Sequence, residues 1–228
     1  MGKSAVTMTI ENATQLIGKI NAKEKEAEKA VADTVKDMKA RAPGWIAAEV
    51  TKVYNIKRAD VTPTGKGKLA GKTRLQTSGK TIEDFAVKYV GQLLTPYHFG
   101  MTPKAPTGGT YTLKMQVIKG QKKVLGKVKK LTKKQRAELA KNFTRSGAKR
   151  SSRSPIMLMG TGNTKQGGVD WIPFQRQSQN RKDIRVIKTV SIPQMVTSER
   201  TNGAIMAKLN TEAAKRLEHH IKRNFKTD

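Results

Sequence analysis

The sequence has no cysteine, few aromatic residues and few acids, and each shortage excludes a class of protein. Without cysteine the chain cannot form a disulfide scaffold, a thiolate-bound zinc site or a thiol nucleophile. Aromatic residues make up 5% and apolar residues 36% of its 228 positions, which predicts a lean core and extended segments that order against neighbours. No apolar run approaches the roughly 20 residues that span a bilayer, and no signal peptide is recognisable. We therefore expect a soluble, unexported chain with no membrane partner.

The shortage of acids leaves a very large positive charge. The chain has 46 Lys and Arg residues against 17 Asp and Glu residues, which gives a formal net charge of +29. Such a charge opposes self-association of the free chain and attracts polyanions or acidic protein surfaces. Nucleic acid is therefore the first class of partner to consider, and acidic proteins are the second.

The clearest periodic pattern is an apolar stripe in residues 11–41, which predicts a long helix. Charged residues of both signs fill the opposite face of this helix, as is typical of a solvated surface. The Pro-Gly pair at positions 43–44 predicts its end, and residues 45–54 then predict a shorter amphipathic helix. Residues 11–61 are thus expected to form an N-terminal helical part.

The middle of the chain alternates between loop and strand patterns. Residues 62–80 are rich in Gly, Thr and Lys and predict a flexible loop, and a β-rich part is expected over residues 81–200. Alternating apolar residues predict one strand at 85–89 and another at 111–117. A turn after the second of these is expected to lead into a partner strand that carries Val124.

Further elements follow towards the C-terminus. Residues 132–143 begin with capping-box spacing and predict a short helix, and residues 156–159 and 184–192 predict two more strands separated by a polar loop. Asn202 is expected to cap a final helix within residues 201–228. The apolar stripe of this helix recurs at every fourth position, at Ile205, Leu209, Ala213, Leu217, Ile221 and Phe225.

This layout predicts one α+β domain over residues 1–228, in which a long N-terminal helix and a C-terminal helix pack on a small, mainly antiparallel sheet. Extended basic loops are expected to leave this domain, chiefly the insertion at residues 104–153, which has sixteen Lys and Arg residues and one acid. Its basic side chains are the candidate contacts to DNA or to acidic protein surfaces, two alternatives that the sequence leaves open. The candidates are Lys119, Lys122, Lys123, Lys127, Lys129, Lys130, Lys133, Lys134, Arg136, Lys149, Arg150 and Arg153.

No constellation of residues predicts an enzyme, a metal site or a cofactor. The segment 71–73 (GKT) resembles the end of a phosphate-binding loop, but position 66 is Lys where that motif requires Gly. His98 is isolated in the sequence. His219 and His220 are neighbours on a predicted helix, so their side chains point about 100° apart and do not form a paired-ligand face. We expect no catalytic residues.

Three short phrases occur in a fixed order along the chain. Residues 49–61 (EVTKVYNIKRADV) contain the pattern Y-x-I-x-x-x-x-V after a long helix, and residues 96–104 (PYHFGMTPK) follow in the middle. Residues 190–196 (VSIPQMV) then precede the terminal helix. In order and spacing this set resembles the phage minor tail protein Z family of tail-completion proteins, across nearly the whole chain.

The resemblance implies a non-enzymatic virion protein of a tailed bacteriophage, assembled in the host cytoplasm. Members of this class form rings, often hexameric, at the head-proximal end of the tail, as tail-completion or tail-terminator subunits. Partners implied by the resemblance are other copies of the chain, the tail tube or terminator, the tape measure protein and the head-completion proteins of the neck, around the DNA channel. The alternative that the sequence leaves open is a cytosolic nucleic-acid-binding protein of ribosomal or nucleoid type.

Overall fold

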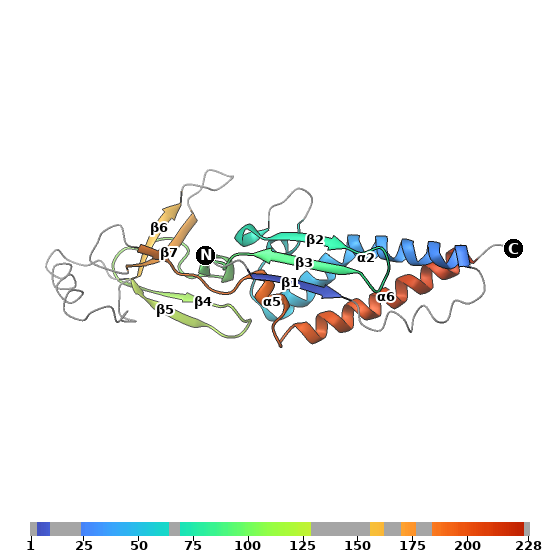
Figure 1. The fold of residues 1–228 in the computed structure, drawn as a ribbon. Coiled ribbons are helices and arrows are strands. Elements are labelled where there is room, and N and C mark those ends of the chain that lie inside the picture. Colours follow the sequence, from blue (N-terminus) through green and yellow to red (C-terminus); the bar gives the residue numbers. More distant parts are fainter. Residues whose placement is uncertain are drawn as a thin grey trace. The chain divides into compact units, whose positions relative to one another are not determined.

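The structure is a computed structural model that describes residues 4–9, 24–63, 69–128, 156–161, 170–176 and 184–225 (Figure 1). Its long helices and small antiparallel sheets confirm the α+β class. The chain divides into two compact units. Unit 1 comprises Met1–Leu93 and Val190–Asp228, and unit 2 comprises Leu94–Thr189. That residues 1–228 form a single domain remains a prediction.

The first long helix of unit 1, α2, extends from Glu24 to Val53 and passes through Pro43 without interruption (Figure 1). The predicted helix end at this proline is therefore wrong. A proline removes one helical hydrogen bond, but the buried stripe continues on the same face, with Met38 before the proline and Ile46 after it, both 1% exposed. Burial of this stripe outweighs the missing bond. The first part of the predicted helix, residues 11–23, lies outside the described residues.

The second long helix, α6 (Asn202–Asn224), packs along α2 and confirms the predicted apolar stripe. The fully buried members of that stripe are Ile205, Leu209, Ala213 and Leu217. The prediction that Asn202 caps the helix is wrong, because the helix starts at Asn202 and Thr201 occupies the N-cap position. The Thr201 hydroxyl donates to the backbone carbonyl of Met195, which ties the start of α6 to the preceding helix.

The sheet of unit 1 has three antiparallel strands in the order β1-β3-β2, with β3 in the centre. The strands are β1 (Ser4–Thr9), β2 (Arg74–Ser78) and β3 (Ala86–Gly91). The strand predicted around Val87 is confirmed. The prediction of a loop over residues 62–80 is wrong in part, because this segment includes the short 3₁₀ helix η1 (Ala70–Lys72) and the strand β2. The residues of β2 are too polar for a strand pattern, and pairing with β3 determines their conformation.

The connection from β2 to β3 is a turn closed by Asp84. The backbone N–H groups of Lys80 and Thr81 donate to the Asp84 carboxylate at 2.8 and 2.6 Å. Chiefly because of the bond from Lys80, and also that from Thr81, the pKa of Asp84 lies below its ordinary value. Ile82 and Phe85 anchor the turn, since both side chains are buried in the core of unit 1.

A short helix, α5 (Ile192–Val196), precedes α6. The Gln194 N–H donates to the Ser191 hydroxyl at 3.3 Å, and the Ser191 N–H donates to the Gln194 side chain at 2.9 Å, which is a complete capping box. The prediction of a strand over 184–192 is therefore wrong at its end, and only Ile184–Val186 (β8) is a strand. The capping box and the proline in the first turn of α5 favour a helix start at this point.

Unit 2 is mostly β-structure. A hairpin consists of β4 (Tyr111–Met115) and β5 (Lys123–Val128), and a separate sheet has the order β6-β7-β8, with β6 at Ile156–Thr161 and β7 at Asp170–Arg176. A 3₁₀ helix, η2 (Pro96–Phe99), contacts β4 and β7. The strands predicted at 111–117, at Val124 and at 156–159 are confirmed.

Strand β7 lies within the segment predicted as a polar loop, so that prediction is wrong. The alternation in β7 is interrupted by Pro173, and polar residues surround the strand in the sequence, which hides its pattern. The predicted helix at 132–143 lies outside the described residues. Among the described residues, no helix is both long enough and apolar enough to cross a bilayer.

Candidate functional site

The candidate site is the basic hairpin of unit 2, which we define as residues 111–128. Its two strands pair in antiparallel register from Tyr111 opposite Val128 to Met115 opposite Lys123. The register shifts between Leu113 and Lys114, which is the signature of a β-bulge. A bulge twists a hairpin and changes the direction of the side chains beyond it, so it affects how the lysines of the tip are presented.

One face of the hairpin packs on the core of unit 2. Leu113 is fully buried with Met101 and Ile156, and Tyr111, Leu125 and Val128 pack around these three residues. The second edge of β4 is held as well, because the backbones of Thr102 and Lys114 exchange two hydrogen bonds of 2.9 Å. The hairpin is therefore anchored along both its inner face and its outer edge.

The opposite face of the hairpin carries two of its cations. Lys114 is exposed and pairs across the strands with Val124, and Lys127 is exposed opposite Thr112. Residues that pair directly across an antiparallel ladder point to the same side, so these four side chains share the outer face. Lys119 and Lys122, at the turn, are also exposed. The ribbon thus presents the ammonium groups of Lys114 and Lys127 on one side, and those of Lys119 and Lys122 at its turn.

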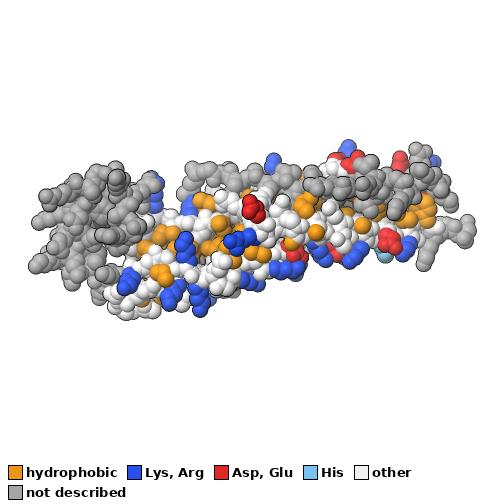
Figure 2. Space-filling view, turned by 90° about the horizontal axis from the view of Figure 1, so that it is seen from below, with side chains coloured by type: hydrophobic (Ala, Val, Ile, Leu, Met, Phe, Trp, Pro, Cys, Tyr) orange, Lys and Arg blue, Asp and Glu red, His pale blue; other side chains and the backbone are white. Residues whose placement is uncertain are grey.

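The charge around the hairpin is almost uncompensated. Asp170 is the one acidic residue among the described residues of unit 2. Figure 2 shows Lys and Arg side chains, mixed with apolar ones, on the part of the surface over β4 and β5. Ammonium groups placed this way attract polyanions or acidic protein surfaces, and this attraction weakens strongly as salt increases.

The structure accounts for only part of the predicted site. Of the twelve candidate residues, those it describes are Lys119, Lys122, Lys123 and Lys127. All four lie on the hairpin, but Lys123 pairs with the buried Met115 and Lys127 lies on the opposite face. Lys114 was not predicted as a contact from the sequence, and the bulge and the register place it on the same face as Lys127. The other eight candidates lie outside the described residues: Lys129, Lys130, Lys133, Lys134, Arg136, Lys149, Arg150 and Arg153.

Val124 is a second residue that was not assigned to a site from the sequence. It is 57% exposed although it lies within a strand, and it stands beside lysines rather than in the core. The strand pattern identified it as a member of β5, but only the register shows that it shares the outer face with Lys114. An apolar side chain in this place adds apolar area that a bound partner would shield from water, on a surface that is otherwise charged.

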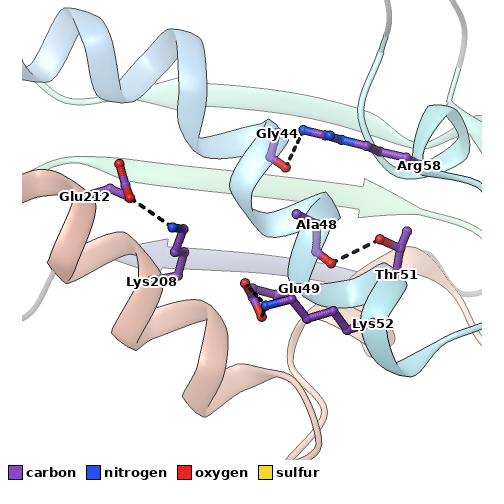
Figure 3. A network of polar contacts seen from close by, with 8 residues as sticks. All are labelled: Gly44, Ala48, Glu49, Thr51, Lys52, Arg58, Lys208 and Glu212. Carbon is purple, nitrogen blue, oxygen red and sulfur yellow. Dashed lines mark hydrogen bonds and ion pairs between the residues drawn. The ribbon is translucent and has the colours of Figure 1, made fainter.

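The polar contacts of unit 1 stabilise its helices (Figure 3). Arg58, from the short helix α3 (Arg58–Val61), donates to the Gly44 carbonyl at 3.1 Å, next to the proline in α2. On α6, the Lys208 ammonium donates to the Glu212 carboxylate at 2.9 Å and is the main reason that the pKa of this carboxyl lies below its ordinary value. Lys208 and Glu212 lie one helical turn apart, as is typical of helix-stabilising pairs, and Arg58 links two adjacent helices.

Of the two histidines of α6, His219 is exposed and His220 has structural surroundings. His220 is 5% exposed, and its Nε2 atom lies 3.3 Å from Asp37 Oδ2 on α2. Arg216 lies 3.8 Å from the same oxygen, so one carboxylate faces two nitrogen-bearing side chains. Within the described ranges, no group of three or more His, Asp or Glu side chains lies close enough together to hold a metal ion.

Removing charge from the hairpin is expected to weaken polyanion binding more than removing the same amount of charge elsewhere in the chain. We predict that changing Lys119, Lys122, Lys123 and Lys127 to Gln lowers the magnitude of the slope of log K against log salt for duplex DNA by up to about 3.6, at about 0.9 for each phosphate that is no longer neutralised. The slope is measured by fluorescence anisotropy with a labelled duplex over a salt series.

A matched control removes the same charge from unit 1. Lys25, Lys29, Lys36 and Lys57 are all exposed, on or next to α2 and α3. Changing these four to Gln is expected to alter the slope by less than about 1, because only contacting cations release counterions. An equal decrease of the slope in both variants would show that net charge, and not the hairpin, determines binding.

The fold and the basic hairpin are the features in which the chain can be compared with known proteins. No family model, no curated protein and no solved structure matches it. The fold and the site define an α+β protein of two compact units, one of which presents an anchored, strongly basic hairpin.

Proposed function

We propose that the chain is a virion structural protein of a tailed bacteriophage, a tail-completion or tail-terminator subunit of the neck. The observation that supports the proposal is the ordered set of phrases that resembles the minor tail protein Z family. In the first phrase Tyr54, Ile56 and Val61 are buried just beyond α2. The second phrase begins with η2, and the third contains the capping box of α5. The phrases thus coincide with fold-determining positions, where a family resemblance is expected to persist.

In this proposal the subunits form a ring at the head-proximal end of the tail, with six copies as in many members of the family that the chain resembles. A net charge of +29 keeps free subunits apart until they meet the end of a tube. Once some subunits are in place, each further contact becomes effectively intramolecular, so weak contacts suffice to complete the ring. The ring then joins the tail tube and tape measure protein to the head-completion proteins around the DNA channel.

The basic hairpin supplies the outward contact in this proposal. Its lysines lie on an anchored ribbon, so the backbone gives up little conformational entropy when they meet an acidic surface or the genomic DNA. No step of the proposed function requires catalysis or a cofactor. We accordingly propose a structural and not an enzymatic role.

The test is reconstitution of head–tail joining. Lysates of a phage carrying a stop codon in this gene are expected to contain separate filled heads and tails, and addition of the purified chain is expected to restore infectious particles by orders of magnitude. The hairpin variant with four Gln residues should restore fewer particles than the unit 1 control variant. Normal particles in the unsupplemented mutant lysate would contradict the proposal.

A second candidate is a nucleic-acid-binding protein of ribosomal or nucleoid type, and the charge of the hairpin favours it. This candidate predicts tight binding of DNA or RNA by the free chain, with steep salt dependence, and a gene outside any tail operon. Head-closure genes on one side of the gene and tail-tube or tape-measure genes on the other would instead favour the phage assignment.

A further inference from the structure

The outer face of the hairpin continues past β4 onto a neighbouring segment of unit 2. Thr102 forms an antiparallel bridge with Lys114, and residues paired in this way point to the same side, so the exposed Thr102 joins the face. Lys114 in turn pairs with Val124 on β5. Thr112 and Lys127 form the adjacent row. The face therefore consists of two lysines, two threonines and one valine, and it contains no carboxylate.

The two ammonium groups of this face have no group of opposite charge beside them on it. Lys114 and Lys127 are diagonal neighbours across the two strands, and the Cα atoms of such neighbours lie about 7–8 Å apart. Two cations at this separation repel each other, and an anion placed between them removes the repulsion. Lys119 and Lys122 add two more exposed cations at the turn. The hairpin is therefore suited to a partner that presents several negative charges in succession.

The composition of the outer face favours a phosphate backbone over an acidic protein as that partner. The centres of protein–protein interfaces are enriched in aromatic residues, Met and Arg, and they are depleted in Lys. The outer face has the opposite composition, since its charged residues are lysines and it has no aromatic residue, Met or Arg. Phosphate oxygens, by contrast, are typically contacted by lysine and threonine side chains.

The same composition favours a duplex over a single strand. Proteins that bind single strands stack the bases on aromatic side chains. Tyr111 is the one aromatic residue of the hairpin, and it packs against the core of unit 2 on the inner face. A duplex needs no stacking platform, and it presents one negative charge for about every 1.7 Å of its axis.

We propose that the outer face of the hairpin binds the phosphate backbone of duplex DNA, with Lys114 and Lys127 as its central contacts and the lysines of the turn beside them. The binding is independent of base sequence, because contacts to phosphate carry no sequence information. The core that anchors the hairpin holds the two lysines in position for the contact. This inference rests on the proposed function, in which the genome passes through the ring, and it makes the hairpin the part of the subunit that touches that genome.

The direct test compares two exposed lysines of β5 that lie on opposite faces. Lys127 belongs to the outer face, whereas Lys123 pairs with the buried Met115. Lys127→Gln is expected to lower the magnitude of the slope of log K against log salt for duplex DNA by about 0.9, and Lys123→Gln by less than about 0.3. Both variants have the same net charge, so only the position of the lost lysine differs. Fluorescence anisotropy of the full chain with a labelled duplex measures the two slopes.

Competing ligands separate duplex DNA from the other classes of polyanion. At equal salt we expect the duplex to bind at least about fivefold more tightly than a single strand with the same number of phosphates, because each contact to a single strand releases fewer counterions. Polyglutamate with the same number of charges is expected to compete at least about tenfold less well, because its charges lie further apart along the chain.

Three results would overturn the proposal. Equal slopes for Lys123→Gln and Lys127→Gln would show that total charge, and not the outer face, determines binding. Competition by polyglutamate as strong as that by the duplex would assign the face to an acidic protein, and tighter binding of the single strand would assign it to unpaired nucleic acid.

Failure of this inference can be told apart from failure of the proposed function. A chain that restores head–tail joining but fails the comparison of the two lysines would refute the inference alone. A chain that passes the comparison without restoring head–tail joining would refute the proposed function and leave the DNA contact in place.

Discussion

Replacement of Gly79 by Ala is expected to lower the free energy of unfolding by about 3 kcal/mol or more, the largest effect of any single methyl group that we predict. Gly79 has a φ of +114°, a conformation that side chains with a Cβ rarely adopt. A Cβ added there would lie 2.6 Å from Phe85 Cα and 2.9 Å from the Asp84 carbonyl oxygen. Both neighbours are backbone atoms, so no side-chain rotation relieves the overlap.

The surroundings of Gly79 prevent the backbone from yielding. Phe85 is 1% exposed in the core, and the strand β3 that follows it is paired on both sides. The Asp84 carboxylate holds the turn itself through Lys80 and Thr81. Urea denaturation followed by circular dichroism measures the effect as a shift of the midpoint.

Gly203→Ala is the matched control for this prediction. Gly203 lies in the first turn of α6, and a Cβ added there meets no atom within 4 Å. Alanine favours helix over glycine, so the control is expected to be stabilised by up to about 1 kcal/mol. Equal stability of Gly79→Ala and the wild-type chain would contradict the close approach of Gly79 to Phe85 in this turn.

The second large effect is expected from Leu113→Ala in the hairpin. Leu113 is fully buried with Met101 and Ile156, so its truncation leaves a cavity in a small core. Truncations of this kind cost about 2 to 5 kcal/mol, and we expect about 3 kcal/mol. Because Leu113 belongs to unit 2, amide hydrogen exchange is expected to accelerate in β4, β5 and β6 while β3 and α6 remain protected.

Val124→Ala tests whether this effect arises from burial. The two residues lie in the same hairpin, but Val124 is 57% exposed and leaves no cavity when truncated. Its effect on the free energy of unfolding is expected to stay within about 0.5 kcal/mol. Faster exchange in both units of Leu113→Ala would contradict the division of the chain into two compact units.

The elements with strong local patterns could be predicted from the sequence. The stripe of α6 follows a helical period, and the alternation in β4 follows a strand period, so each pattern reflects the face that becomes buried. The cases in which prediction failed depend on contacts between segments distant in the sequence. Continuation of α2 through Pro43 is decided by what its stripe packs on, and β2 is a strand because β3 lies beside it.

The candidate site was predictable in composition and not in arrangement. The density of lysines between residues 104 and 153 is visible in the sequence. That Lys114 and Val124 share a face follows from the bulge and the register of the hairpin. Likewise, only the pairing of β6, β7 and β8 brings Met157, Phe174 and Val186 side by side, and β7 has no clear strand pattern of its own.

The central claim is that the chain is a structural subunit of a phage neck, and its most direct test is the position of the chain in the virion. The measurement is negative-stain microscopy of isolated tails mixed with the purified chain carrying a gold-labelled tag. We expect one ring of label at the head-proximal end of each tail and none along the tube. Label along the whole tube, or no label on tails while the chain binds free DNA, would contradict the claim.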